Sequence, residues 1–478
     1  YTPLHLLLFS LPDGLEDFTD CLVMTSGNPA GAPICRTDED ACDALSSIAD
    51  LILSHGREIR LCADDSVMDF YDGAPYMIRR SRGYAPLPLM LSADFQGSVL
   101  GIGGELKNTF CLAKNSLFYP SPYLGDMSDL RTLRALRQAL PRMERLLAIT
   151  PAAVAADLHP RYETSRFAET LGLPIFKVQH HHAHVLSVMA ENDHLAPVIG
   201  VSFDGTGYGT DGTIWGGEIM LATTRDFQRI ASLAPFFHAG GALAAREGWR
   251  LAVSLLHLYC GREDALLHSK KLGLATEKEA ASVIFQLEHG LHTTTSTSAG
   301  RLFDAVSALL GIRRISTYEG EAAIYLQFAA EAAEKAGKSA QADALLARWK
   351  ADGTLQAPPA ESVITITDGR FLLTSNDLFC HLLQYRLQNV SSDLLALAFH
   401  RGLAAAIRDA CKNAREMTGC STAALTGGVF QNTLLLRLTQ NALEKDGFHV
   451  LHHSIIPPND GGIAVGQALF AMQCLKDK

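Results

Sequence analysis

The sequence lacks the marks of three protein classes. No stretch approaches the roughly 18 consecutive apolar residues of a membrane-spanning helix. The ten cysteines are scattered from Cys21 to Cys474 without a CxxC pair, which excludes a dense disulfide scaffold and favours reduced core thiols in a cytoplasmic protein. Acidic residues outnumber basic ones, and the net charge of −10 argues against a broad nucleic-acid-binding surface.

Two catalytic signatures are also missing. The HExxH pattern of metalloproteases is absent, because position 181 is His and no glutamate base lies inside the motif, and the diglycine string Gly427–Asn432 is not a Walker loop. With 47% hydrophobic and 19% charged residues, the chain has the composition of an ordinary globular protein, and its 478 residues predict two or more domains. Because it begins at Tyr1 without Met or a signal pattern, we expect it to be a fragment of something longer.

The first predicted block covers residues 1–83. Its elements are short buried strands at Leu4–Phe9 and Cys21–Met24 and a helix over Asp38–Leu53. Pro86 and Pro88 favour extended backbone, so Tyr84–Ser98 is predicted to be a linker.

Polar groups in this block suit an acyl-adenylate or phosphate ligand. Thr25–Asn28 offers small hydroxyl and amide donors in a tight loop, while Asp64-Asp65-Ser66 and Arg79–Arg82 add a carboxylate pair and a basic stretch. A polar turn and a solvated arginine run explain the same residues equally well.

A pattern of strand, glycine turn and return strand then occurs twice. Val99–Gly104 enters a glycine turn and is followed by the strand-like Thr109–Ala113; Val198–Gly207 and Ile219–Thr223 repeat this about a hundred residues later. The repeat predicts two similar α/β lobes around a cleft, although it is short enough for coincidence.

The remaining elements follow from hydrophobic periodicity. Strands are predicted at Ala152–Ala156, Ile175–Val178, Ala423–Thr426 and His449–His452, and helices at Leu130–Leu147, Ala244–Leu258, Glu277–His289, Leu302–Leu310, Ala322–Lys350 and Leu394–Met417. The charged, alanine-rich helix over 322–350 is expected to face solvent.

Four histidines lie within the five residues His180–His184, between a predicted strand and the helix-like Val185–Glu191. Positions i and i+4 share one face of a helix, so His180 and His184 can direct two imidazoles at one metal, with His181 and His182 pointing elsewhere. Packing or capping histidines are the alternative.

A site with two histidines needs at least one oxygen ligand. Asp204 opens a glycine-rich turn, Asp204–Gly209, and Asp460 lies in Pro457–Gly462 ahead of the helix-like Ile463–Met472. The glycines would also let backbone N–H groups approach a phosphate. Either aspartate alone is more often part of a plain turn.

Two further turns are candidates for a nucleotide cleft. Gly427–Asn432 follows a predicted strand and precedes a helix, and Gly300–Asp304 places a carboxylate one turn into a helix, where it could accept ribose hydroxyl groups. An ordinary N-capping turn accounts for each equally well.

Together these strings resemble the HypF family of hydrogenase-maturation carbamoyltransferases. The residues that carry the resemblance run in family order over nearly the whole chain: Pro3–His5, Met24–Asn28, Asp64–Val67, Arg79–Pro86, Gly103–Phe110, Asp157–Pro160, Gln179–His184, Gly300–Asp304, Glu319–Ala323, Gly427–Asn432 and Asn459–Gly462.

The resemblance implies an α/β fold of two parts. Residues 1–90 correspond to the C-terminal part of a YrdC-like carbamoyl-adenylate domain, and residues 91–478 to a two-lobed ASKHA-type (actin/hexokinase-like) carbamoyltransferase domain. The family's acylphosphatase-like domain, zinc-finger region and first half of the YrdC-like domain are missing, which leaves open whether this chain makes carbamoyl-adenylate by itself.

The chemistry implied is ATP-dependent carbamoyl transfer. Carbamoyl phosphate is cleaved in the missing domain, ATP and carbamate form carbamoyl-adenylate, and the carbamoyl group passes to the C-terminal cysteine thiol of HypE on the route to the cyanide ligand of the nickel–iron centre. The expected cofactors are ATP as a substrate, Mg with ATP, and one divalent metal, Zn or Fe, that acts as a Lewis acid. No nucleic-acid or membrane partner is expected.

Residue by residue, the resemblance implies three sets of site residues. Catalytic roles fall on Lys107 and Asn108, and metal ligation on His180, His184, Asp204 and Asp460. Nucleotide binding falls on Ser26, Asn28, Arg82, Gly205, Gly300, Asp304, Glu321, Gly427, Gly428 and Asn432. One departure is that Ala242 and Gly248 stand where the family usually has an acidic residue and the proline of Pro-Trp-Arg.

Two other functions remain as alternatives. One is a threonylcarbamoyl-type acyltransferase that modifies tRNA on the same fold, against which the acidic balance weighs. The other is a nucleotide-dependent, partner-binding fragment that holds ATP without turnover. The docking surface for a partner is a guess within residues 262–350.

Overall fold

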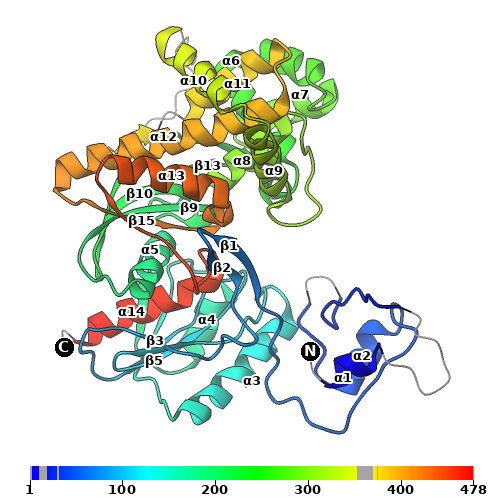
Figure 1. Ribbon diagram of the computed structural model, residues 1–478, viewed down its shortest axis with the longest axis vertical. Coiled ribbons are helices and arrows are strands. Elements are labelled where there is room, and N and C mark those ends of the chain that lie inside the picture. The colour runs from blue at the N-terminus through cyan, green and yellow to red at the C-terminus, as the bar shows by residue number, and fades with distance from the viewer. Residues whose placement is uncertain (1–2, 10–18, 30–31, 353–369, 374, 477–478) are drawn as a thin grey trace.

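The computed structural model describes residues 3–9, 19–29, 32–352, 370–373 and 375–476. Two α/β lobes are stacked on one another, and a small N-terminal segment with helices α1 (Pro3–Leu7) and α2 (Asp38–Leu45) lies to one side (Figure 1). Within the described residues, no helix is both long enough and apolar enough to cross a membrane.

The first lobe is built on a six-stranded sheet. Its strand order is β3-β6-β5-β4-β7-β8, with bounds β3 Leu89–Met90, β4 Ser98–Gly101, β5 Cys111–Lys114, β6 Leu117–Pro120, β7 Ala153–Asp157 and β8 Ile175–Val178. Successive side chains of a strand point to opposite faces. Leu100 and Val154 therefore pack with α3 (Leu130–Leu147) and α4 (Glu163–Thr170), whereas Val99 and Ala153 pack with α5 (His180–Glu191) and α14 (Ile463–Lys476).

The second lobe is built on an eight-stranded sheet. The path is β12-β13-β10-β9-β15-β16, with β11 beside β10 and β14 beside β11. The strands are β9 Val198–Tyr208, β10 Ile214–Ala222, β11 Phe227–Leu233, β12 Phe236–Ala239, β13 Thr293–Ser296, β14 Phe371–Leu373, β15 Thr422–Thr426 and β16 His449–Leu451.

Helices cover one face of this sheet and connect its strands. They are α6 Gly248–Lys271, α7 Glu277–Glu288, α8 Ala299–Leu309, α9 Glu321–Lys335, α10 Ser339–Asp352, α11 Ser375–Leu387, α12 Ser392–Thr418 and α13 Thr433–Lys445. Helix α5 lies against the other face, so α5 and α14 occupy the space between the two sheets (Figure 1).

The predicted repeat is confirmed by the strand connections. In the first lobe β5 is antiparallel to β4, and β7 and β8 continue parallel to it; in the second lobe β10, β9, β15 and β16 are related in the same way. Gly103 follows strand β4, but the turn predicted over Asp204–Gly209 is wrong for Asp204–Tyr208, which lie within the equivalent strand β9 because Gly207 and Tyr208 still pair with β10.

Three predictions near the N-terminus are wrong. Leu4–Phe9 contains the helix α1 instead of a strand, Cys21–Met24 has no regular structure, and the helix over Asp38–Leu53 ends at Leu45. A strand needs a hydrogen-bonded neighbour, and no described strand lies alongside either segment. Helix α2 buries none of its residues, so nothing supports it beyond Ser46 and Ser47, which favour turns.

Two further predictions need correction. The predicted linker Tyr84–Ser98 contains the edge strand β3, and it buries Leu91 and Phe95 in the core. The single helix predicted over Ala322–Lys350 is interrupted at Gly337, whose φ of 75° is left-handed, and α9 is not a solvent-facing helix because it buries Leu326, Ala330 and Ala333. Of the ten cysteines, three are buried, so the expectation of core thiols holds for a minority.

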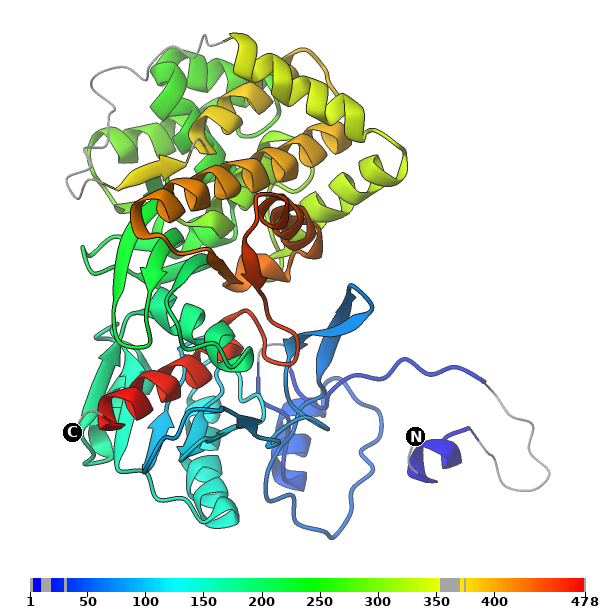
Figure 2. The same cartoon turned by 60° about the vertical axis from the view of Figure 1, so that its left-hand side comes forward.

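The hairpin of β1 (Val67–Tyr71) and β2 (Ala74–Arg79) packs on the second part of the chain, although it lies within the predicted first domain. Tyr76 is 1% exposed in the core of the second lobe, and its hydroxyl donates to Phe430 O at 2.8 Å. Asn459 Nδ2 donates to Ile78 O at 3.0 Å. Figure 2 shows the hairpin standing beside the first lobe and reaching towards the second.

Candidate metal and nucleotide site

Helix α5 begins directly after strand β8 and carries the histidine cluster in its first turns. Gln179 is the N-cap: its side-chain oxygen accepts a hydrogen bond from His182 N at 2.9 Å. His180 and His184 are each 1% exposed, because α5 is enclosed between the two sheets. The helical spacing predicted from the sequence is therefore present, and both imidazoles face the carboxyl end of β9.

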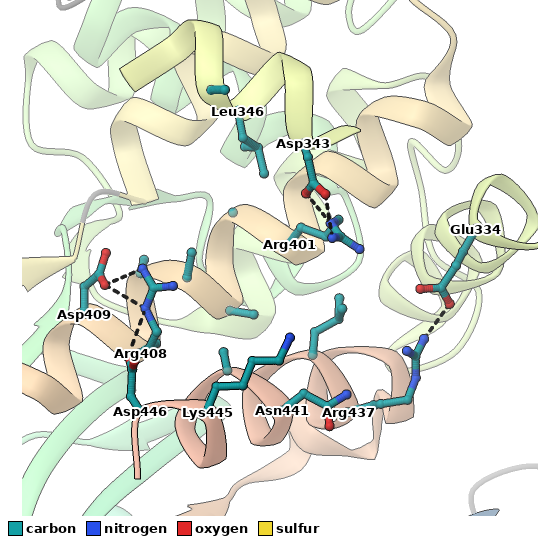
Figure 3. A pocket seen from close by; sticks show the side chains of 17 residues that line it. Glu334, Asp343, Leu346, Arg401, Arg408, Asp409, Arg437, Asn441, Lys445 and Asp446 are labelled. Carbon is teal, nitrogen blue, oxygen red and sulfur yellow. Dashed lines mark hydrogen bonds and ion pairs between the residues drawn. The ribbon is translucent and has the colours of Figure 1, made fainter. Parts of the chain in front are cut away.

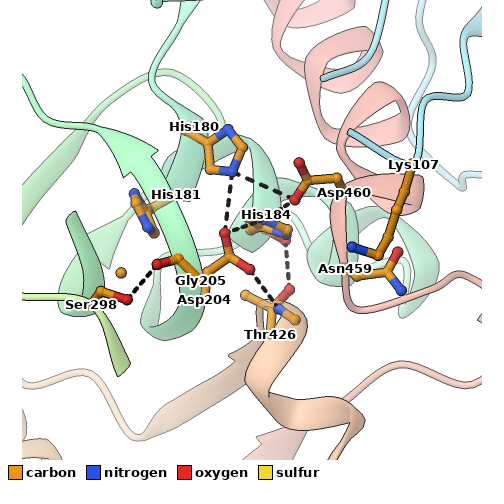
Figure 4. Close-up of polar contacts among 12 residues, drawn as sticks. Lys107, His180, His181, His184, Asp204, Gly205, Ser298, Thr426, Asn459 and Asp460 are labelled. Atoms are coloured by element: carbon orange, nitrogen blue, oxygen red, sulfur yellow. Dashed lines mark hydrogen bonds and ion pairs between the residues drawn. The ribbon is translucent and has the colours of Figure 1, made fainter. Parts of the chain in front are cut away.

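The four predicted metal ligands come together. His180 Nε2 lies 3.4 Å from Asp204 Oδ2 and 3.7 Å from Asp460 Oδ1, and His184 Nε2 lies 3.9 Å and 3.5 Å from the same two oxygens (Figure 4). One ligand atom from each residue lies within 4.8 Å of all the others. Asp204 is on β9 and Asp460 is in the short turn before α14, so helix α5, a strand of the second sheet and the segment before α14 each contribute.

The donor set fits a divalent cation. The Nε2 atoms of His180 and His184 are buried and have no hydrogen-bond partner, which is costly unless a ligand satisfies them. Two imidazole nitrogens and two carboxylate oxygens suit Zn or Fe and do not choose between them.

The electrostatics of the cluster favour a positive charge. Burial tends to lower the pKa of His180, but Asp460, Asp157 and Asp204 outweigh it and raise that pKa well above its ordinary value. Burial opposes ionisation of Asp460, yet His180 and His184 hold its pKa at about 2. The carboxylates are therefore ionised at neutral pH, as metal ligation requires.

The other two histidines are held away from the ligand atoms, as predicted. His182 Nε2 lies 2.8 Å from Thr223 O. His181 Nδ1 lies 3.1 Å from Gln179 Nε2, and its ring packs near Trp215.

Asp157 also belongs to this site, although the sequence motifs did not predict it. It is fully buried at the end of β7, and its Oδ2 lies 2.7 Å from His180 Nδ1. This hydrogen bond keeps the proton on Nδ1 and leaves Nε2 as the ligand atom. The available signal was an aspartate at the end of a predicted buried strand, just ahead of His159-Pro160.

The variant Asp157→Asn should bind the divalent metal about 10- to 100-fold more weakly, because the ring of His180 loses its charged partner. Competition with a metal chelator would measure the affinity. Asp193→Asn is the matched control, because Asp193 lies just after the same helix and, within the described part of the chain, its side chain accepts a hydrogen bond only from Ser92 N. Equal affinities of Asp157→Asn and the parent chain would contradict the role.

Glu191, at the other end of α5, anchors the segment that leads to Asp460. Its Oε1 accepts hydrogen bonds from Ser454 N, Ile455 N and Ile456 N at 2.9, 2.6 and 3.0 Å. Helix α5 thus carries two of the candidate ligands and also fixes the loop that leads to a third.

The two predicted catalytic residues differ in their surroundings. Lys107 Nζ forms an ion pair with Glu319 and lies next to Asp460 in Figure 4. Burial tends to lower the pKa of Lys107, but Glu319 and Asp460 raise it, so the lysine is charged. Asn108 is fully buried, and its Nδ2 donates to Ile102 O and Gly104 O at 3.0 and 2.7 Å, which shapes the glycine turn. Both catalytic roles remain predictions.

Four of the predicted nucleotide-binding glycines meet beside Asp204. Ser298, the N-cap of α8, donates from its hydroxyl to Gly205 O, and Gly428 N donates to Asp204 Oδ1 at 3.0 Å. A Cβ on Gly300 would lie 3.0 Å from Gly205 Cα, so the helix start and the strand end need glycine to approach. Gly427, with φ of 97°, completes the group.

Three predicted nucleotide-binding side chains are held by protein partners. Glu321 is paired with Arg313 at 2.6 Å. Asn432 caps α13 and lies 2.9 Å from His400 Nε2. Asp304 lies 3.2 Å from Arg301 Nη2, and burial raises its pKa to about 6. Their nucleotide roles stay predictions.

Ser26 and Asn28 lie apart from this cluster. They line a cavity of about 680 Å³ together with Arg79 and with residues of the first lobe, among them Tyr123 and Arg131. Asn28 Nδ2 donates to Ala32 O at 2.7 Å, so it also holds its own turn. Arg82 does not line that cavity; it is exposed and pairs with Asp65 at 3.5 Å.

A second hollow of about 650 Å³ lies between α10, α12 and α13, away from the histidines (Figure 3). Three arginines around it are paired with carboxylates: Arg401 with Asp343 at 2.7 Å, Arg437 with Glu334, and Arg408 with Asp409 at 2.6 Å. Its floor of alanine and leucine side chains carries no catalytic group.

Comparison with known families assigns three segments. Residues 1–81 match the Sua5/YciO/YrdC family described as "Telomere recombination", residues 94–191 match "HypF Kae1-like domain", and residues 200–467 match "Carbamoyltransferase, Kae1-like Domain, second subdomain". These matches confirm the predicted α/β fold, in which YrdC-like sequence precedes a two-lobed ASKHA-type domain.

Curated proteins and solved structures resemble the chain along its whole length. It is 36% identical to "Carbamoyltransferase HypF" of Rhizobium leguminosarum bv. viciae, over 100% of this chain and 59% of that protein. It is 33% identical to "Probable carbamoyltransferase HypF" of Methanocaldococcus jannaschii, over 98% and 58%. The structure of "full-length HypF in the phosphate- and nucleotide-bound form" aligns with a TM-score of 0.82 and 33% identity, over 95% of this chain and 67% of that one. The chain thus spans somewhat less than two thirds of the curated relatives' length.

Proposed function

Because the chain belongs to the HypF carbamoyltransferase family, we propose that it performs the transfer step in which a carbamoyl group passes from carbamoyl-adenylate to a protein thiol. The acceptor is the C-terminal cysteine of a HypE-type hydrogenase maturation protein. The observation that carries this proposal is the convergence of two histidines and two aspartates on the glycine turns of the same cleft.

The transfer exchanges one bond for another at the carbamoyl carbon. The thiol sulfur attacks that carbon, the bond from carbon to the phosphate oxygen breaks, AMP leaves with the bonding pair, and the thiol proton is released. His180, His184, Asp204 and Asp460 would hold the divalent metal. When bound, this metal supplies Lewis-acid polarisation of the mixed anhydride or its phosphate.

The chain's own groups position the reactants. Asp157 orients His180, and the glycines at 205, 300 and 428 give backbone N–H groups close access to the nucleotide. Lys107 adds a fixed positive charge on the Asp460 side of the cleft, where it can stabilise negative charge that develops on the leaving phosphate. ATP is the proposed source of the adenylate, with Mg as its counter-ion.

The experiment supplies carbamoyl-adenylate separately from the transfer step. A full-length relative whose two metal histidines are replaced by alanine would make the intermediate from ATP, Mg²⁺ and carbamoyl phosphate without transferring it. Addition of this chain should then carbamoylate the C-terminal peptide of a HypE-type protein, detected by mass spectrometry as the mass of one carbamoyl group.

One control and two alternative outcomes test this proposal. A HypE-type protein with Ser in place of its C-terminal Cys should stay unmodified. Binding of ATP with no carbamoylated peptide would reject the transfer proposal in favour of a partner-binding role, and tight tRNA binding at low salt would favour the RNA-modifying alternative.

A further inference from the structure

One buried cation near the cleft is only partly neutralised. Arg301 is 8% exposed, and its Nε and Nη1 atoms have no hydrogen-bond partner. Its Nη2 lies 3.2 Å from Asp304 Oδ2, its one nearby ion-pair partner among the described residues. A buried guanidinium normally uses most of its five N–H donors, so two unsatisfied nitrogens indicate a missing acceptor.

At the unpartnered nitrogens, an anion would be stabilised both by the guanidinium and by the N-terminus of helix α8. Arg301 is in the first turn of α8, an 11-residue helix capped by Ser298. The N–H groups of that first turn have no carbonyl partner within the helix, and the helix dipole adds positive potential there. The guanidinium and the start of α8 therefore both make the electrostatic potential at this point more positive.

The position of Arg301 links it to the metal cluster. A Cβ on Gly205 would lie 4.0 Å from Arg301 Nη2, and Gly205 directly follows the metal-ligating Asp204 on β9. The two sides of the Asp204–Gly205 segment thus face the metal ligands and Arg301, respectively. Gly300, at the start of α8, packs directly on this segment, because a Cβ there would lie 3.0 Å from Gly205 Cα.

The neighbouring charges do not satisfy the guanidinium. Burial raises the pKa of Asp304, Arg301 lowers it and Glu319 raises it, and the result is a pKa of about 6. Burial and Arg301 together lower the pKa of His238 to about 4, so this histidine is neutral and adds no competing positive charge at neutral pH. A dianionic ligand would stabilise the pocket more than Asp304 alone.

We propose that Arg301 and the first turn of α8 bind the phosphate of the adenine nucleotide on the side of Asp204–Gly205 opposite the metal. The proposal rests on the proposed function, since it assigns the nucleotide's phosphate a partner within that same cleft. Arg301 would act as a binding and positioning residue: its fork of N–H donors matches two phosphate oxygens and fixes the phosphate beside Gly205.

The test compares ligands with and without phosphate. Calorimetric titration of the metal-loaded chain with ATP, AMP, adenosine and inorganic phosphate should show that Arg301→Gln weakens ATP and AMP by about 10- to 100-fold and leaves adenosine unchanged. Arg301→Met, which fills a similar volume without charge, should behave in the same way, and Arg301→Lys should recover part of the affinity. Arg401→Gln is the matched control, because that arginine pairs with Asp343 on the far side of α12.

The outcomes separate this proposal from the proposed function. An equal loss of affinity for AMP and adenosine would assign Arg301 a structural role and overturn the phosphate site, as would unchanged affinity for AMP. If the parent chain bound no nucleotide, the nucleotide step of the proposed function would fail. Inorganic phosphate that binds the parent chain but not Arg301→Gln would then still support the anion site.

Discussion

The double variant His180→Ala with His184→Ala is expected to purify with almost no bound divalent metal and to lose carbamoyl transfer, while its far-UV circular dichroism matches that of the parent chain. The substitutions remove both nitrogen ligands and leave only Asp204 and Asp460, which do not hold Zn or Fe tightly by themselves. Metal content by mass spectrometry and the peptide assay described above measure the two losses.

His182→Gln is the matched control for this experiment. His182 is also buried on α5, but its Nε2 bonds to Thr223 O rather than facing the cluster. This variant should keep one metal per chain and its activity. A double variant that retained stoichiometric metal would show that the ligands lie elsewhere, and full transfer activity without metal would exclude a metal role in the reaction.

The variant Gly466→Ala should be strongly destabilised and should bind metal poorly. A Cβ on Gly466 of α14 would lie far inside van der Waals contact with the backbone carbonyl of Ala183 on α5. Alanine improves helix propensity by about 1 kcal/mol. Overpacking against backbone costs about 3 kcal/mol, since neither helix can yield between two sheets. The substitution therefore lowers the free energy of unfolding overall, and it displaces α5, the helix that carries His180 and His184.

Thermal unfolding and metal titration measure the two effects of Gly466→Ala. Gly56→Ala is the control, because nothing lies within 4 Å of a Cβ at that position. Gly56→Ala should unfold at the temperature of the parent chain. An unchanged midpoint for Gly466→Ala would mean that α5 and α14 can separate at little cost.

The convergence of the four candidate metal ligands could be predicted because their signals are local. The interval between His180 and His184 is one helical turn, and both aspartates precede glycines beside a predicted strand or helix. Asp157 and Arg301 were missed because their roles depend on tertiary contacts. Asp157 reaches His180 across neighbouring strands, and Arg301 differs from any other helical arginine only through its burial and its unsatisfied nitrogens.

The nucleotide roles of polar residues at turns stay predictions. Asn432 and Glu321 occur in strings typical of nucleotide sites, and both side chains bond to groups within the protein. A short polar motif has the same appearance whether it caps a helix or binds a ligand. The repeated strands were predictable from hydrophobic runs and glycine turns, whereas the apolar run Leu4–Phe9 was misassigned because periodicity alone does not show whether a pairing strand exists.

The hairpin β1–β2 limits where the domains of two related chains can be joined into a chimera. Its Tyr76 fills the core of the second lobe, and its backbone bonds to the segment that ends at Asp460. A chimera joined at residue 90 would import a foreign hairpin into that core and would alter the support of a metal ligand. A segment that keeps the support of Asp460 intact therefore has to begin at Val67, inside the part of the chain that matches the YrdC family.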